Sequence, residues 1–335
     1  MKLSTPRWWY RRKPGMRATR TLLTPLSWVW RGVTAWRIAR ARPIDPGAPV
    51  ICVGNLTAGG TGKTPIVREV LSQLREMGVA AHGLSRGYGG RLAGPVRVEP
   101  TSQTAEDVGD EPLMLARDFP IWVSRDRVTG AKAAAAAGAE AIVMDDGHQN
   151  PALAKTLSLV VVDGETRDGE WPFGDGAVFP AGPMREPLTT GLARADAVVL
   201  LLPSDISEPD PALLAALGST PVLIAHLDPA APPPPGPQFG FAGVGKPWKV
   251  ERALRAAGCD LVDFAAFPDH GQYDAATLEA LVRQAQARGA GLVTTEKDWV
   301  RLPAAWREQV KVWPVRARFE DERALRTLLG AALAP

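Results

Sequence analysis

The segment that most constrains the fold of this chain is a glycine-rich loop between an apolar run and a helical segment. Val50–Gly54 predicts a buried strand, residues 55–64 have the sequence NLTAGGTGKT, and a helical pattern begins at Pro65. This order is typical of a P-loop, in which backbone N–H groups and a helix N-terminus surround phosphate oxygens. The strict motif begins with glycine, whereas this chain has Thr57 at that position. The sequence therefore predicts a nucleoside triphosphate site.

Two side chains of the loop carry the expected chemistry. Lys63 is expected to reach the β- and γ-phosphates and to act in catalysis, and the Thr64 hydroxyl is expected to ligate Mg²⁺. The residues expected to bind the nucleotide form one run: Thr57, Ala58, Gly59, Gly60, Thr61, Gly62, Lys63 and Thr64.

A P-loop enzyme also needs an acidic strand end that holds the metal, and two segments have the pattern. Residues 141–147 (AIVMDDG) end in Asp145 and Asp146, and residues 159–164 (LVVVDG) end in Asp163. Adjacent carboxylates at a strand tip are costly unless a cation neutralises them, which favours Asp145 and Asp146 as Mg²⁺ ligands. Asp163 remains the alternative ligand, or a helix cap.

Short β-branched runs alternate with helical segments after Pro49, which predicts an α/β fold with a mostly parallel sheet and helices on both faces. The expected strands are Val50–Gly54, Ile121–Val123, Ala141–Asp145, Ser158–Asp163, Ala197–Leu202, Pro221–Ala225, Phe239–Val244 and Gly291–Thr295. The expected helices include Pro65–Met77, Val128–Ala137, Lys249–Ala257 and Ala275–Arg288. Residues 228–237 are too rich in proline for either element and predict a stiff linker.

These patterns predict four regions. An N-terminal arm (1–45) precedes a P-loop core (46–227), the linker (228–237) and a smaller α/β domain (238–335) that contributes to the active site.

Charge is concentrated in the arm. Up to Arg42 the chain has eleven basic and no acidic residues, which leaves 28 basic against 36 acidic residues in the rest. A general nucleic-acid binder would carry its basic surface on the folded domain, so this class is excluded. Cys52 and Cys259 are too few for a disulfide framework and are expected to be small core residues.

The arm also holds five of the eleven tryptophans. Thr24-Pro25 predicts a helix start, and one face of the following helix would present Leu26, Val29, Trp30, Val33 and Trp36. Trp and cationic side chains together favour a helix that lies on an anionic membrane surface, and the apolar stretch is too short to span a bilayer. The alternative is a helix that packs on the body of the protein.

Seven segments resemble the motifs of one family, the tetraacyldisaccharide 4′-kinases, also called lipid A 4′-kinases. They follow the family's order across nearly the whole chain: VGNLTAGGTGKTP (53–65), LSRGYG (84–89), VGDEP (108–112), DDGHQ (145–149), PAGPMREP (180–187), FPDH (267–270) and TTEKD (294–298). The family often has Phe and His where this chain has His148 and Asn150, so the roles of those family residues are not transferred.

The resemblance implies transfer of the ATP γ-phosphate to the 4′-hydroxyl of tetraacyldisaccharide 1-phosphate, which forms lipid IVA in the biosynthesis of lipid A and lipopolysaccharide. It implies ATP and Mg²⁺ as cofactors and a peripheral position at the cytoplasmic face of the inner membrane, held by the arm. No obligate protein partner is expected.

The resemblance also implies roles for individual residues. Asp110 matches the base that accepts the hydroxyl proton, and His270 matches the histidine that pairs with it. Alternatively, Asp110 caps the helical segment 112–117, His270 caps a turn, and Asp269 is the active acid. Lys297 is a candidate for holding the nucleotide base. Arg86 and Tyr88 resemble family residues that line the substrate site. By their position after a strand, Arg125 and Arg127 are candidates for binding the 1-phosphate of the substrate. Arg185 and Glu186, in a Pro/Gly loop, are expected near the phosphates or the metal.

Three other functions stay open. One is a membrane-associated P-loop ATPase switch of the partitioning type. Such a switch has a signature Lys where this chain has Ala58, which counts against this class. A GTP-dependent metal-insertion chaperone would need an Asn-Lys-x-Asp guanine motif, which Thr295-Glu-Lys-Asp298 does not match. A small-molecule kinase whose arm binds another protein is the third alternative.

Overall fold

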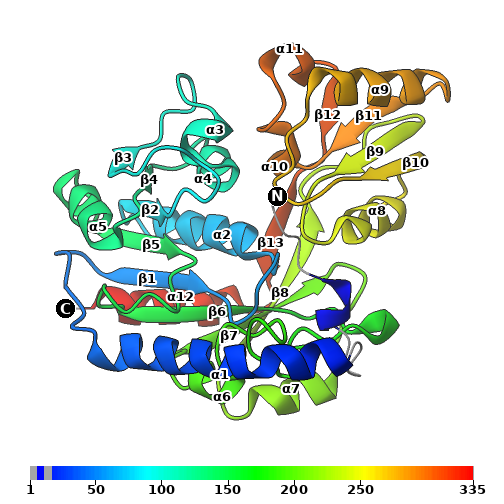
Figure 1. Ribbon diagram of the computed structural model, residues 1–335. Helices are drawn as coiled ribbons and strands as arrows, with labels where there is room; N and C mark the ends of the chain where they lie inside the picture. Colours follow the sequence, from blue (N-terminus) through cyan, green and yellow to red (C-terminus); the bar gives the residue numbers. More distant parts are fainter. Residues whose placement is uncertain (1–5, 11–16, 335) are drawn as a thin grey trace.

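The computed structural model describes residues 6–10 and 17–334. Within those residues the strands form one sheet of nine strands and one of four (Figure 1). The first sheet has the order β13-β8-β7-β6-β1-β5-β2-β4-β3, and its strands are β1 (Val50–Gly54), β2 (Ala81–Ser85), β3 (Val96–Arg97), β4 (Ile121–Val123), β5 (Ala141–Asp145), β6 (Leu157–Asp163), β7 (Ala197–Pro203), β8 (Val222–Pro229) and β13 (Val315–Phe319). The second sheet has the order β10-β9-β11-β12, with β9 (Gln238–Ala242), β10 (Leu261–Ala266), β11 (Gly291–Thr294) and β12 (Val310–Val312).

The first sheet is parallel except at its two edges. From β8 to β4 every neighbouring pair is parallel, whereas β13 pairs antiparallel with β8 and β3 pairs antiparallel with β4. Parallel strands need crossover connections that place helices on both faces. The predicted α/β fold with a mostly parallel sheet is therefore confirmed.

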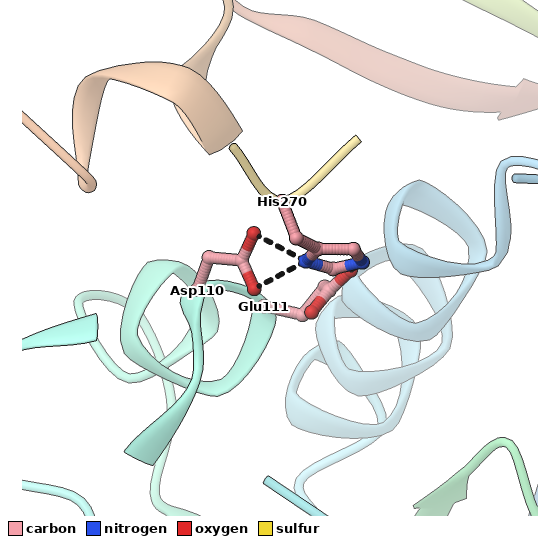
Figure 2. Close-up of side chains that lie close together, drawn as sticks. All are labelled: Asp110, Glu111 and His270. Atoms are coloured by element: carbon pink, nitrogen blue, oxygen red, sulfur yellow. Dashed lines mark hydrogen bonds and ion pairs between the residues drawn. The ribbon is translucent and has the colours of Figure 1, made fainter. Parts of the chain in front are cut away.

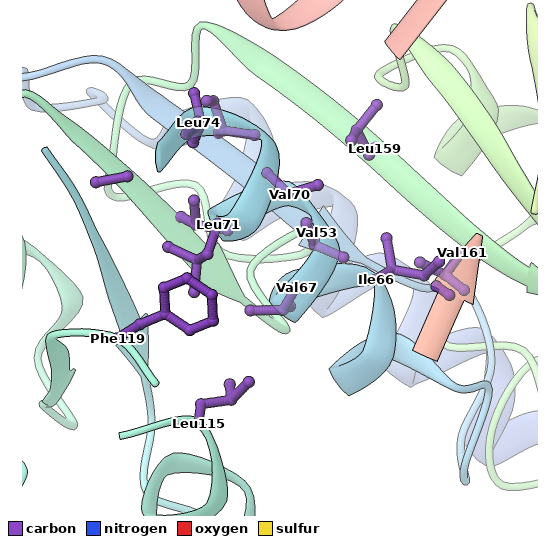
Figure 3. Packing of buried hydrophobic residues seen from close by; sticks show 14 of the residues in the cluster. Val53, Ile66, Val67, Val70, Leu71, Leu74, Leu115, Phe119, Leu159 and Val161 are labelled. Carbon is purple, nitrogen blue, oxygen red and sulfur yellow. The ribbon is translucent and has the colours of Figure 1, made fainter. Parts of the chain in front are cut away.

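Helices cover both faces of this sheet because side chains alternate along each strand. On β6, Leu159 and Val161 join the core under α2 (Lys63–Glu76) and α12 (Glu322–Leu333), and α4 (Asp110–Leu115) adds to it. Val160 and Val162 join the opposite core with α6 (Leu188–Leu192) and α7 (Pro211–Leu217), while α5 (Arg127–Ala136) covers the part of that face over β1, β5 and β2. Figure 3 shows the apolar face of α2 in the first core. The buried side chains of α2 there recur every three to four residues: Ile66, Val67, Val70, Leu71 and Leu74.

The second sheet is parallel throughout and has helices on both sides. The apolar residues of α9 (Ala275–Gln286) pack with Phe239 and Phe241, and α8 (Pro247–Ala256) packs with Leu261 and Val293. The remaining helices are short: α3 (Ala105–Val108), α10 (Glu296–Trp299), α11 (Ala304–Arg307) and the 3₁₀ turns η1 (Arg7–Tyr10) and η2 (Arg167–Gly169).

The connection between the sheets differs from the predicted linker. β8 continues through Pro229, and β13 returns beside it, with Arg316 opposite Asp228. After β13, α12 packs its apolar residues Leu325 and Leu329 on the first domain. The second domain therefore ends near residue 312 rather than at 335, because the last strand and helix bury their apolar faces against the first sheet.

The N-terminal helix also differs from its prediction. Helix α1 spans Arg17–Arg40 and runs through Pro25, whereas Thr24 donates a hydrogen bond to the Arg20 carbonyl instead of capping a helix start. Ser27 is buried and bonds the segment 178–181, and this contact fixes the helix at mid-length. Three basic residues of the arm, Arg11, Arg12 and Lys13, lie outside the described residues. Cys52 and Cys259 are both free and buried, as expected.

Candidate active site

The phosphate loop lies between β1 and α2, at the carboxyl edge of the first sheet. Gly62 precedes α2 with φ 78°, and a Cβ at this position would overlap the Leu201 side chain. Asn55 is fully buried, and its amide donates hydrogen bonds to the Thr57 carbonyl and the Thr61 hydroxyl. Thr57 is absent from the non-glycine residues with positive φ within the described part of the chain, so this position does not require the glycine of the strict motif. The structure thus confirms the predicted strand, loop and helix.

The paired carboxylates lie beside the loop because β5 is the direct neighbour of β1, with Val53 opposite Asp145. Asp146 has φ 52° and lies 2.7 Å from Arg185 Nη1 and 3.4 Å from Lys63 Nζ. Burial raises the pKa of Asp145 to about 6. Burial also opposes ionisation of Asp146, but Lys63 and Arg185 outweigh it and hold the pKa of that carboxyl low.

One carboxylate oxygen of this acidic pair has no hydrogen-bond donor among the described residues. Oδ1 of Asp145 is buried and has no hydrogen-bond partner within the described residues. A buried carboxylate oxygen without a donor is costly, and a divalent cation would satisfy it. Asp145, Asp146 and Thr64 are therefore a donor set of hard oxygens that fits Mg²⁺.

Asp163, the alternative metal ligand, is paired with two lysine side chains. It lies 2.6 Å from Lys249 Nζ and 2.9 Å from Lys246 Nζ, both from the second domain. This pairing of Asp163 favours Asp145 and Asp146 as the metal acids and joins the two domains beside the phosphate loop.

Asp110 and His270 come from different domains and meet at the interface (Figure 2). Asp110 is the first residue of α4 and is 4% exposed, while His270 follows β10. His270 Nδ1 lies 2.9 Å from Oδ2 and 3.1 Å from Oδ1 of Asp110. Burial lowers the pKa of His270, but the Asp110 carboxylate outweighs it, so the pKa lies above its usual value. The N-cap of α4 is Gly109, so the alternative role of Asp110 as a helix cap is wrong.

Two further charged residues, Lys297 and Glu111, lie at this interface, and neither was predicted to lie there. Lys297 Nζ lies 2.7 Å from Glu111 Oε1, 3.2 Å from Asp269 Oδ1 and 3.3 Å from His270 Nε2. The pair Asp110–Glu111 and His270 have the spacing of a metal site, with ligand atoms within 4.8 Å of one another. The Lys297 ammonium already supplies a cation to this cluster, so we assign no metal to it. The sequence did contain a signal for Glu111, because this residue directly follows Asp110 in the VGDEP motif.

A small cavity of about 80 Å³ opens beside the pair. It is lined by Tyr88, Glu106 and Gln272 as well as by Asp110 and His270. Tyr88 is 63% exposed, and its ring centroid lies 5.2 Å from that of His270. Tyr88 therefore lines the cavity with a largely exposed ring.

The predicted substrate arginines do not all lie in one place. Arg86 and Arg125 are exposed, on the loops after β2 and β4. Arg127 is 5% exposed and donates to the Ser124 carbonyl, with a longer contact to the Asp145 carbonyl. Because its guanidinium is bound to the backbone, Arg127 positions the end of β5 and is not presented to a substrate phosphate.

Arg185 and Glu186 were predicted near the phosphates or the metal, and their placements differ. Arg185 bonds the Thr57 carbonyl and Asp146, which places it at the phosphate loop. Glu186 is buried and accepts two hydrogen bonds from Arg194 at 2.7 Å and one from Gln149. Glu186 is therefore bound to Gln149 and Arg194 inside the protein and has no exposed oxygen for a substrate.

His148 and Asn150, where the chain departs from the family motif, have structural roles. His148 bonds Ser158 and the Gly191 carbonyl, and burial lowers its pKa to about 4. It packs so closely on Gly54 that a Cβ there would lie 2.5 Å from the His148 Cβ. The Asn150 side chain accepts a hydrogen bond from the Ala152 amide.

The N-terminal elements η1 and α1 contact the region of the phosphate loop. Trp30 Nε1 donates to the Arg185 carbonyl at 3.0 Å, and the Tyr10 hydroxyl donates to the Ala58 carbonyl. The outward face of α1 leaves large apolar side chains exposed: Leu22, Leu26, Trp28, Val29, Val33 and Trp36. No helix of the described residues is long and apolar enough to cross a bilayer.

Comparisons with known proteins agree with one another. The family model described as "Tetraacyldisaccharide-1-P 4'-kinase" matches residues 19–334. A tetraacyldisaccharide 4'-kinase of Caulobacter sp. strain K31 is 70% identical over 330 residues, covering 98% of each chain. The enzyme of the same name from Phenylobacterium zucineum is 69% identical over 331 residues, covering 98% of this chain and 99% of that one. A crystal structure of LpxK from Aquifex aeolicus in complex with ATP has a TM-score of 0.76 and 25% identity, and covers 94% of this chain and 100% of that chain.

Proposed function

The chain belongs to the tetraacyldisaccharide-1-P 4′-kinase family, and on this premise we propose that it transfers the γ-phosphate of ATP to the 4′-hydroxyl of a tetraacyldisaccharide 1-phosphate. The product would be lipid IVA, in the biosynthesis of lipid A. The observation that carries the proposal is the Asp110–His270 pair, which joins the domain that holds the P-loop to the second domain. The alternative of a partitioning-type ATPase switch finds no support in the comparisons.

The phosphate loop and its neighbours would hold the nucleotide. The N–H groups of the loop and of the first turn of α2 offer donors to the phosphates, with Lys63 as the cation. Thr64, Asp145 and Asp146 would hold Mg²⁺, and the unpartnered Oδ1 of Asp145 supports this assignment. The ion, when bound, supplies charge neutralisation at the phosphates.

The acceptor side would be built by Asp110. Phosphoryl transfer forms a bond between the 4′-oxygen and the γ-phosphorus and breaks the bond from that phosphorus to the β–γ bridging oxygen. The hydroxyl proton must leave, and the Asp110 carboxylate accepts it late in the transfer, when the attacking oxygen has become acidic. The Asp110 carboxylate holds the pKa of His270 above its usual value, and a hydrogen bond from Nδ1–H of His270 to Asp110 would keep the carboxylate oriented toward the cavity.

The substrate carries several acyl chains, and α1 offers a surface for a lipid interface. The exposed apolar side chains on its outward face, with Arg31, Arg37 and Arg40 on the same helix, are typical of a helix that lies in the headgroup region of an anionic membrane. We expect peripheral binding at the cytoplasmic face of the inner membrane, where the acceptor hydroxyl can reach the cavity.

The test is transfer of labelled phosphate from ATP to tetraacyldisaccharide 1-phosphate in detergent micelles. The variant Asp110→Asn keeps the shape of the side chain and removes the base, so kcat should fall by about 10²–10⁴-fold with ATP binding little changed. The matched control is Asp260→Asn. Asp260 is exposed and directly precedes β10, at the opposite end of that strand from His270. Unchanged kcat in Asp110→Asn would refute the role of the pair, and no transfer by the unmodified enzyme would refute the reaction.

A further inference from the structure

Arg301 occupies a central position in the second domain that the proposed chemistry does not use. It follows α10, and its side chain is 7% exposed. All three guanidinium nitrogens donate to acceptors of the protein. Nε donates to the Lys297 carbonyl at 3.2 Å, Nη1 to the Gly271 carbonyl at 3.0 Å and Nη2 to the Gly243 carbonyl at 2.7 Å.

The partner of Arg301 is Asp298, which is 0% exposed. Besides the ion pair with Arg301, Asp298 Oδ1 accepts from the Gly243 amide at 2.8 Å and from the Tyr273 hydroxyl at 2.6 Å. The two charges thus bind the loops that follow three parallel strands, β9, β10 and β11. Because parallel strands end at the same edge of a sheet, these loops converge there.

Two of these loops carry the contacts of the second domain with the reaction site. The loop after β10 carries His270, and Gly271 follows directly. The loop after β9 begins at Gly243 and reaches Gly245, where a Cβ would lie 3.0 Å from the Gly60 amide of the phosphate loop. One guanidinium therefore holds both the acceptor side and the nucleotide side of this domain.

The backbone at His270 makes that restraint necessary. His270 has φ 56°, a left-handed conformation that costs energy for a residue with a side chain. Such a conformation persists only where the surroundings fix it, and the hydrogen bond from Arg301 to Gly271 acts on the next residue. Arg301 Nε also lies 3.8 Å from Asp110 Oδ2, so its charge faces the carboxylate that His270 must meet.

We propose that Arg301 is a positioning residue for phosphoryl transfer, which holds His270 on Asp110 and the Gly245 loop on the phosphate loop. The proposal rests on the proposed function, because it assigns to Arg301 an effect that passes through His270. Arginine suits this task, since its planar fork offers five donors in fixed directions and lysine offers three on one atom.

The test compares Arg301→Met, Arg301→Lys and His270→Ala, singly and combined, in the labelled-phosphate assay. Displacement of a catalytic group by about 1 Å can cost about 10²-fold in rate, so Arg301→Met should lower kcat by roughly that factor. The KM for ATP should rise much less, because Lys63 and the loop remain in place. Arg301→Lys should recover part of kcat, because it keeps the charge and some of the donors.

The double variant separates positioning from general structure. If Arg301 acts through His270, then Arg301→Met should cost little further activity in the His270→Ala background. The matched control is Arg307→Met, since Arg307 also donates to backbone carbonyls, those of Leu302 and Val300, but lies on α11. We expect this control to change melting temperature without changing kcat per folded molecule.

Four outcomes decide the question. Equal kcat in folded Arg301→Met and the unmodified enzyme, or losses that multiply in the double variant, would overturn the proposal. If Arg301→Met does not fold, Arg301→Lys replaces it in the comparison with His270→Ala. Losses of kcat that multiply in the Arg301→Lys, His270→Ala double variant would also overturn the proposal. Unchanged kcat in His270→Ala would instead remove the role of His270 in the proposed function.

Discussion

Lys297 offers a sharp test of how this interface is held together. Its ammonium lies among three carboxylates from both domains, at 2.7 Å from Glu111, 3.2 Å from Asp269 and 3.9 Å from Asp110. Lys297→Met keeps most of the apolar stem and removes the charge. Among the described residues, the ion pairs that remain to these carboxylates would then be those of His270 and Arg301.

The expected loss of stability follows from these distances. At an effective dielectric constant near 20, unit charges 2.7 Å apart attract by about 6 kcal/mol, and the desolvation of Lys297 offsets part of this. Removal of one partner from a buried pair costs about 3–5 kcal/mol, since the remaining charge is left without compensation. We expect a loss of this size in the free energy of unfolding at pH 8.

The loss in the free energy of unfolding should depend on pH, and the ionisation of Glu111 determines whether it grows or shrinks as pH falls. Burial raises the pKa of Glu111, and Lys297 opposes this rise, so the variant should have a still higher Glu111 pKa in the folded state. A carboxyl with a raised folded pKa destabilises the fold above that pKa and has no such effect below its unfolded value. The difference between variant and parent should therefore shrink as pH falls, by up to about 1.4 kcal/mol per unit.

Urea denaturation followed by tryptophan fluorescence, at pH 8 and at pH 5.5, measures this difference. The control is Lys311→Met, which removes an exposed charge on β12 of the same domain. A second variant, Lys297→Met with Glu111→Gln, should regain stability because it also removes the uncompensated carboxylate. Equal unfolding midpoints for Lys297→Met and Lys311→Met, or a loss that is the same at both pH values, would refute this reasoning.

Three further predictions address other contacts. NMR titration of the His270 imidazole should give a pKa above the ordinary value. Asp110→Asn should lower this pKa, because the carboxylate that raises it is gone while burial and the Lys297 charge still lower it; no change between the two would contradict the pairing. Gly245→Ala would place a Cβ 3.0 Å from the Gly60 amide, so kcat/KM for ATP should fall about tenfold or more, whereas Gly330→Ala, with nothing within 4 Å, should have no effect. Val29→Asp on α1 should weaken binding to anionic lipid vesicles in a flotation assay, and the same substitution of Leu214 on α7 should not; equal binding of both would exclude α1 as the lipid surface.

The sequence by itself determined the features whose cause is local. The strand, loop and helix at residues 50–76 follow from an apolar run, glycines and an amphipathic pattern, and the structure has them there. The same holds for β5 and its terminal carboxylates, since parallel neighbours end at one edge. The segment 108–112 and His270 came from resemblance to a family, because no spacing in the sequence relates two residues 160 positions apart.

The tertiary structure alone decided the features that depend on distant partners. Residues 315–334 return to the first sheet because β8 has a free edge and α12 needs a surface for its apolar face. Helix α1 runs through Pro25 because contacts at Ser27 fix it on residues 178–181. From the sequence, Arg127 and Glu186 are expected at the substrate, its phosphates or the metal, yet both are buried against other groups of the protein. Local patterns fix which elements form, whereas the choice of partners depends on which surfaces can be buried together, and that choice placed Lys297 and Arg301 at the centre of the site.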